Sequence, residues 1–216
     1  SMMGYRRMSI NSATGYVTFH NGHGDLAEKF NLEGFAQRGM ILSVAKDYTN
    51  KVVRATKSSV PIGVISTNPG ALMSLDGDFT IGGATKLLYN NGVVEVGLAG
   101  TVPVIVATEK GPIKSGDPIT VGNIPGVGVK ALSSSSIVGT ALESSSVWDI
   151  AQCKQVSSVE SINWPEDNGK NELKPCFQLP DGTYIGKILL VLGVSWYDPR
   201  ISIPEYQEEN EDLLKR

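Results

Sequence analysis

The chain has 216 residues, of which 24 are glycine and 11 are proline, while charged residues make up 19% and aromatic residues 7%. This composition fits a folded protein rich in turns and argues against a disordered chain or a long charged helix. The net charge is −3 and lies in the acidic segment 205–216, so the rest of the chain is neutral. A neutral body without a basic stripe argues against nucleic acid or an anionic membrane as the main partner.

Short apolar runs separated by turn residues predict a domain of many short strands. The expected strands span residues 16–20, 40–45, 51–56, 61–66, 93–98, 101–106, 118–121, 127–131, 137–142 and 185–196. The turn at Thr49 and Asn50 predicts a hairpin between the second and third strands. This spacing indicates a mostly β fold, a compact barrel-like or sandwich domain. No apolar run approaches 18 residues, so we expect no membrane insertion.

Three of the expected strands contain a glycine directly after a β-branched residue, at Gly63, Gly139 and Gly186. Glycine within a strand often marks a bulge or a close crossing of two backbones. We therefore expect close crossings at these three positions, as at the corners of a strongly coiled barrel.

The pattern of short strands is interrupted once and fades at both ends of the chain. Residues 144–181 are polar and are expected to form an insertion before the final strand. We expect residues 1–15 to be a tag or linker and residues 16–200 to form one β domain. Residues 201–216 are expected to be an acidic tail with a short C-terminal helix.

Cysteine and histidine residues give no clear metal or redox site. Cys153 and Cys176 lie 23 positions apart and match neither a zinc spacing nor a CxxC motif. The sequence leaves a disulfide between them open and favours two unpaired thiols. His20 and His23 are three residues apart, but no third ligand lies nearby, so we expect no metal and no cofactor.

The densest polar cluster follows the first expected strand and allows several interpretations. Residues 22–27 formally fit a GxGxxA dinucleotide motif, but no βαβ pattern follows and Asp25 would repel a pyrophosphate. Asp25 and Glu28 together fit a capping box, which predicts a short helix over 26–30. Two carboxyls at this spacing, beside His23, also suit peptide hydrolysis, because one acid can stay protonated while the other activates water. The sequence pattern alone leaves both interpretations open.

The run Gly-Asp-Leu-Ala-Glu at 24–28 resembles a family motif in which Asp precedes an aromatic residue or Leu and then Ala-Glu. That motif opens the C-terminal, glutamic-peptidase-like autoproteolytic chaperone domain of phage tailspike and appendage proteins, and related modules end many bacterial surface fibres. The resemblance covers roughly residues 20–198 with gaps. Its further segments, in chain order, are 63–70, 98–104, 111–120, 125–131, 138–143 and 186–191.

This resemblance implies an intramolecular chaperone that assists trimer folding of an upstream fibre segment of the same chain and then cuts it off. Carried over, the cleaved bond is Gly24–Asp25, Glu28 and Asp25 are the catalytic carboxyls, and His23 is a candidate assisting acid or base. Cleaving phage members are expected to have serine where this chain has Gly24, so a reaction that needs that hydroxyl would be lost here. The implied setting is a homotrimer on a virion tail or a bacterial cell surface.

Two alternatives to self-cleavage are a non-catalytic trimerisation module and a glycan-binding surface module. The candidate stacking platforms for glycans are Trp148, Trp164, Trp196 and Tyr197. The same aromatic residues also suit core and interface positions. Apolar residues within 201–206 lie on a segment too short to bury them, which favours cover by a partner chain.

Overall fold

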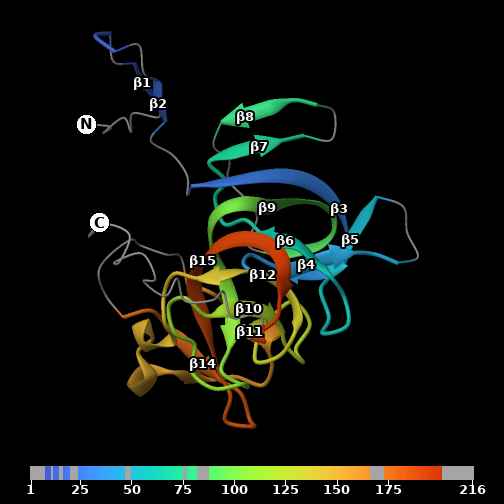
Figure 1. Cartoon of the computed structure of the whole chain (residues 1–216), viewed down its shortest axis with the longest axis vertical. Coiled ribbons are helices and arrows are strands. Elements are labelled where there is room, and N and C mark those ends of the chain that lie inside the picture. Colours follow the sequence, from blue (N-terminus) through green and yellow to red (C-terminus); the bar gives the residue numbers. More distant parts are fainter. Residues whose placement is uncertain are drawn as a thin grey trace, which may run out of the picture.

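The computed structural model is mostly β, with strands that curl into a closed barrel and further strands stacked beside it (Figure 1). It describes residues 8–10, 12–14, 17–19, 24–46, 50–74, 77–81, 88–165 and 173–200. The expected fold class is therefore confirmed. The helix expected within 201–216 lies outside the described residues.

The described chain contains fifteen strands and three short 3-10 helices. The strands are β1 (Met8–Ile10), β2 (Val17–Phe19), β3 (Asp25–Gln37), β4 (Ile41–Val44), β5 (Lys51–Arg54), β6 (Pro61–Ile65), β7 (Ala71–Met73), β8 (Phe79–Ile81), β9 (Leu88–Ala107), β10 (Pro118–Val121), β11 (Gly128–Lys130), β12 (Ser135–Ala141), β13 (Lys154–Gln155), β14 (Cys176–Gln178) and β15 (Tyr184–Tyr197). The 3-10 helices are η1 (Ser145–Val147), η2 (Ile150–Gln152) and η3 (Val159–Ser161). Among the residues that the structure describes, β1 and β2 pair with each other and with no other strand.

Strand β9 organises the fold, because both of its edges pair with other strands along its length. A closed five-strand barrel starts and ends at β9, with the strands paired in the order β9, β15, β12, β10, β11 and again β9. β6, β4, β5 and β3 close a second circuit of five strands through β9. β7 and β8 extend the sheet outward from β3, and Figure 1 shows β8, β7, β3 and β9 lying side by side in this order.

The two faces of β9 belong to two apolar cores. Val102, Val104 and Val106 pack in the core that includes Ile188 and Leu190 of β15. The alternate residues Ile105 and Ala107 pack in the other core, with strands of the second circuit. Each fully buried aliphatic side chain of this kind contributes about 1.5–3 kcal/mol to folding, so the double-sided burial of β9 ties the two circuits together.

Strand β9 corrects one expectation, because residues 93–98 and 101–106 belong to one strand rather than two. Between them Gly100 has φ +96°, a left-handed conformation that glycine adopts without a steric penalty. The chain bends there while its pairing continues, from β3 before Gly100 to β15 after it. The expected hairpin is confirmed by the antiparallel pair β4–β5.

The expected close crossings of two backbones are confirmed at Gly63 and Gly139, whereas Gly186 lies against a side chain. A Cβ on Gly63 would overlap the carbonyl oxygen of Gly97, and one on Gly139 would overlap that of Val191. A Cβ on Gly186 would enter the ring of Trp148. The pairing register also shifts beside two of these glycines, between Leu42 and Ser43 and between Ile137 and Gly139.

The helix expected over 26–30 was wrong, because these residues lie in strand β3. Their backbone groups pair with β9 on one side and with β7 on the other. The capping box is a local signal worth about a kilocalorie, and these long-range ladders outweigh it.

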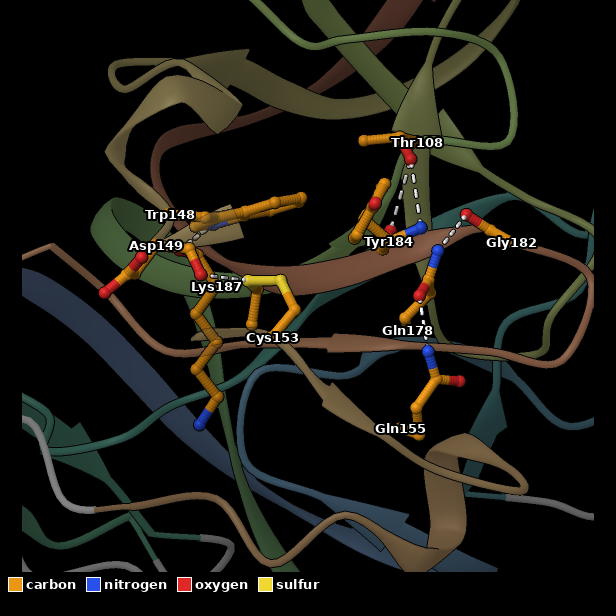
Figure 2. Close-up of a disulfide and its surroundings, with 10 residues drawn as sticks. Thr108, Trp148, Asp149, Cys153, Gln155, Gln178, Gly182, Tyr184 and Lys187 are labelled. Atoms are coloured by element: carbon orange, nitrogen blue, oxygen red, sulfur yellow. Dashed lines mark hydrogen bonds between the residues drawn. A yellow bond between two sulfur atoms is a disulfide. The ribbon is translucent and has the colours of Figure 1, made fainter. Parts of the chain in front are cut away.

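The expectation of two unpaired thiols was also wrong, because Cys153 and Cys176 form a disulfide (Figure 2). Their Cα atoms lie 4.7 Å apart. The bridge joins the residue after η2 to the first residue of β14, directly before the parallel pairing of β13 with β14. Trp148 lies nearby in Figure 2, and its Nε1 donates to the carbonyl of Lys187 at 3.1 Å. The disulfide thus fastens the polar segment to the final strands.

Candidate functional site

The Gly24–Asp25 peptide lies where strand β3 begins. Gly24 is exposed, whereas the next residue, Asp25, is only 3% exposed. Asp25 pairs with Gly100 of β9, and Leu192 of β15 pairs with the same glycine. Gly100 therefore pairs with β3 on one edge of β9 and with β15 on the other edge, and the Gly24–Asp25 peptide lies beside this doubly paired residue.

Backbone hydrogen bonds hold the two residues Gly24 and Asp25 from two sides. The Thr101 N–H donates to the carbonyl of Gly24 at 3.4 Å. The Gly70 N–H donates to the carbonyl of Asp25 at 3.0 Å, just before β7 pairs with β3. The peptide is thus held in the sheet, between β9 and the segment that leads into β7.

The Asp25 side chain lies at one end of the barrel core. Both of its carboxyl oxygens are shielded from solvent. A Cβ on Gly97 would lie 3.1 Å from Oδ2 of Asp25, 3.1 Å from Cγ2 of Val102 and 3.3 Å from Cδ1 of Leu192. The carboxyl therefore shares one small space with two apolar side chains.

Glu28 lies on the other face of β3, where its residue is half-buried. Successive side chains of a strand alternate between faces, so residues three apart point in opposite directions. The register shift near this site leaves Leu98 of β9 without an opposite residue and leaves β3 regular. Three residues of strand also span about 10 Å. The structure thus does not bring the Asp25 and Glu28 carboxyls of one chain together.

The two histidines of the polar cluster, His20 and His23, lie outside the described residues. The proposed assisting role of His23 therefore stays a prediction. Among the described ranges, no group of three or more His, Cys, Asp or Glu side chains is placed to hold a metal ion. No helix in those ranges has the length and apolar character of a membrane span.

The candidate stacking aromatics differ in their accessibility. Trp148 and Trp164 are buried core residues. The indole of Trp164 meets the Phe177 ring edge-on at 5.1 Å, and its Nε1 donates to buried Gln37 at 2.8 Å. Trp196, at 66% exposed, offers a ring to solvent. Two of the four expected stacking platforms, Trp148 and Trp164, are thus structural side chains, while Tyr197 is half-buried.

Gly97 and Gly100 are site residues that sequence reasoning did not single out. Both lie on β9 beneath the Gly24–Asp25 peptide. The segment 98–104 was noted only as part of the family resemblance. The available signal was a pair of glycines three residues apart within an apolar strand-like stretch, where glycine is otherwise disfavoured.

No family model matches the chain, and no curated protein matches its sequence. Two solved structures are similar to it. The first is the pre-mature bacteriophage phi29 gene product 12, with 14% identity and a TM-score of 0.42, over 87% of this chain and 24% of that chain. The second is the C-terminal fragment of bacteriophage phi29 gene product 12, with 15% identity and a TM-score of 0.42, over 78% of this chain and all of that chain. The chain thus spans about a quarter of the first protein's length.

Proposed function

We propose that this chain is a C-terminal chaperone module of a homotrimeric phage or bacterial surface fibre and that it cuts itself at Gly24–Asp25. The module assists folding of an upstream segment of the same chain and then releases it. The support comes from the ordered motif segments of the sequence and from the geometry at this peptide. The expected location of the protein is a virion tail appendage or a bacterial cell surface.

The observation that carries the proposal is the position of the Gly24–Asp25 bond. It joins an exposed residue to the first, buried residue of β3. Hydrolysis there would leave every described residue of the barrel and of β3 in one piece. All pairs that link β3 to β9 would survive, because they begin at Asp25. A cut at this bond therefore frees what precedes it without opening the fold.

The chemistry is the addition of one water across this peptide bond. The water oxygen bonds to the carbonyl carbon of Gly24 and gives up a proton to a base. The bond from this carbon to the Asp25 nitrogen breaks, and that nitrogen takes up a proton to become an amine. We assign the proton donor to the Asp25 carboxyl, which is attached to the same residue and is desolvated.

We assign the base to Glu28 of a neighbouring copy. Within one chain, Glu28 lies on the face of β3 opposite to Asp25. On that face Leu26 is 37% exposed, and its cross-strand neighbours are Ala71 and Ala99. Cross-strand pairs share a face, so Ile81, which is opposite Ala71, extends the same apolar row. The cross-strand neighbours of Glu28 on that face are Met73, which is half-buried, and Val96, which is fully buried, so Glu28 lies where the exposed row meets the core. Contact of another copy with the exposed row would place Glu28 at the edge of the interface between copies.

A non-catalytic trimerisation module is the second candidate. The observation that favours it is that Asp25 and Glu28 of one chain lie on opposite faces of β3. In that case Gly24 stands where a cleaving enzyme needs serine, and the buried Asp25 has a structural role. The two candidates share the trimer and differ in whether the chain is cut.

Incubation of the purified chain over a range of acid and neutral pH tests the proposal. We expect a fragment that begins at Asp25, identified by mass and N-terminal sequencing. The Glu28→Gln variant should stay intact while keeping its melting temperature. When this variant is co-expressed with Asp25→Ala, its own bond should be cut, because the second chain supplies Glu28. Full-length chains under all conditions would leave only the non-catalytic module.

A further inference from the structure

Two glycines of β9, Gly97 and Gly100, lie against the two groups that react in the proposed cleavage. Gly100 is opposite Asp25 in the β3–β9 ladder. A Cβ on Gly100 would lie 2.8 Å from the Cα of Asp25 and would overlap the carbonyl of Gly24. A Cβ on Gly97 would lie 3.1 Å from Oδ2 of Asp25. The Gly24 carbonyl therefore lies where a side chain on Gly100 would lie, and the Asp25 carboxyl lies in contact with the position of a side chain on Gly97.

We propose that Gly97 and Gly100 are positioning residues for self-cleavage. Gly100 admits the scissile carbonyl, and Gly97 admits the carboxyl of Asp25. This inference rests on the proposed function and deepens it, because it gives a role to the 98–104 region. Neither glycine has a side chain that could react, so both act only through the placement of Gly24 and Asp25.

The local pairing explains why these two glycines act together. Asp25 is opposite Gly100 and Ala27 is opposite Gly97, so the β9 side contains one extra residue. A bulge of this kind bends a strand and re-aims neighbouring side chains, and it is common next to active sites. Here it places two glycines of β9 beneath the first residues of β3. The bulge thus brings Gly97 and Gly100 together into one surface that contacts both the Gly24 carbonyl and the Asp25 carboxyl.

The neighbours of Gly97 also allow a purely structural explanation. An added methyl group would approach Val102 as closely as it approaches Asp25, at 3.1 Å, and would lie 3.3 Å from Leu192. The glycine could then serve barrel packing alone. The two explanations differ in whether the cost of a methyl group depends on the Asp25 carboxyl.

The first test is the rate of self-cleavage of Gly97→Ala, followed by intact mass. The methyl group forces the carboxyl to move by a few tenths of an ångström. Since a misplacement of about 1 Å can slow a reaction by about 100-fold, we expect cleavage to slow by up to about tenfold. Gly193→Ala is the matched control, because a Cβ there meets nothing within 4 Å. The control should cleave at the wild-type rate. A Gly97→Ala variant that also cleaves at that rate overturns the inference.

The second test is a double-mutant cycle that does not depend on cleavage. Gly97→Ala should lower the melting temperature less in an Asp25→Ala background than in the wild type, since the crowded carboxyl is then gone. If Gly97→Ala alone fails to fold, the double variant should recover folding. Equal destabilisation in both backgrounds, or a double variant that also fails to fold, assigns Gly97 to barrel packing and overturns the inference.

The outcomes separate this inference from the proposed function. A wild-type chain that never cleaves ends the proposed function, and the positioning role ends with it. A wild-type chain that cleaves, with Gly97→Ala equally fast, ends this inference and leaves the proposed function in place.

Discussion

The closed barrel and the sheet formed by β3, β7 and β8 cover their apolar side chains to different degrees. In the barrel, Ile188 and Leu190 of β15 are fully buried between paired strands. On β8, Phe79 is 61% exposed and Ile81 is 39% exposed. Within the described ranges β8 pairs with β7 alone. The barrel is therefore complete within one chain, whereas the outer sheet is completed by a neighbouring copy in our proposal.

The largest expected effect is in the barrel. Leu190→Ala should lower the free energy of unfolding by about 2–5 kcal/mol, because it leaves a cavity in a closed core. Val191→Ala is the control on the same strand, since Val191 is exposed. Its cost should stay near 0.5 kcal/mol. Equal costs in urea denaturation would show that the barrel is not the stable centre of the fold.

Next is the disulfide that fastens the polar segment to the barrel strands. Changing both Cys153 and Cys176 to serine should lower the free energy of unfolding by about 2–4 kcal/mol. The reason is that the crosslink between these residues, 23 positions apart, no longer restricts the conformations of the unfolded chain. Limited proteolysis should then cut first within 154–175. The double variant should also have a lower melting temperature, and the wild type in a thiol reductant should show the same decrease. A wild-type melting temperature that the reductant leaves unchanged would contradict the prediction.

The outer sheet should respond in assembly rather than in folding. The double variant Phe79→Ser and Ile81→Ser should weaken trimer formation by about 1–2 kcal/mol for each side chain. Light scattering at micromolar concentration measures the shift toward monomer. Val60→Ser is the control, because Val60 is equally exposed but lies outside this sheet. A trimer that persists in the double variant would remove this sheet from the interface.

A smaller effect is expected at the junction between the two regions. Gly24→Ser should speed self-cleavage by about tenfold, or about 1.4 kcal/mol in the barrier, if a hydroxyl assists there. The added Cβ fits, because it would lie 3.5 Å from Oγ1 of Thr101. Gly24→Ala adds the same carbon without the hydroxyl and serves as the control. Equal rates in both variants would remove any role for the hydroxyl.

The smallest effect concerns the exit from β15. Hydrogen bonds from the side chain and then the backbone of Arg200 lower the pKa of Asp198 from 3.8 to about 2. Because this pKa is lowered, any stabilisation is present above about pH 4 and is lost as the pH falls through about 2. In Arg200→Gln the carboxyl of Asp198 should titrate nearer 3.8 by NMR. Asp181, whose pKa is lowered by Thr183, should be unaffected.

The sequence predicted the barrel better than the site, and the reason is the range of the interactions involved. Strands β4, β6 and β15 were predicted because β-branched runs and flanking turns are local signals. The helix over 26–30 was wrong because the partners of these residues are distant in the chain, as Ala71 and Ala99 are from Leu26. The burial of Asp25 depends on the same distant pairing. No local pattern could therefore show that Asp25 and Glu28 face opposite ways.

The disulfide and strand β9 were missed for related reasons. The two cysteines lie in a polar stretch that offers no strand pattern. They are brought together by the pairing of β13 with β14 and by the bridge between Trp148 and Lys174. In β9 the sequence predicts two strands, over 93–98 and 101–106, which lie on either side of Gly100. Glycine there bends the strand without ending it, because each half has its own partner strand.

Native mass spectrometry of the purified chain after incubation tests the central claim most directly, because it measures assembly and cleavage together. The account predicts a complex of three copies, each cut before Asp25, so that every retained barrel chain spans residues 25–216. The Glu28→Gln variant should give a complex of three uncut chains. A single intact chain of 216 residues in the wild type would contradict both the trimer and self-cleavage.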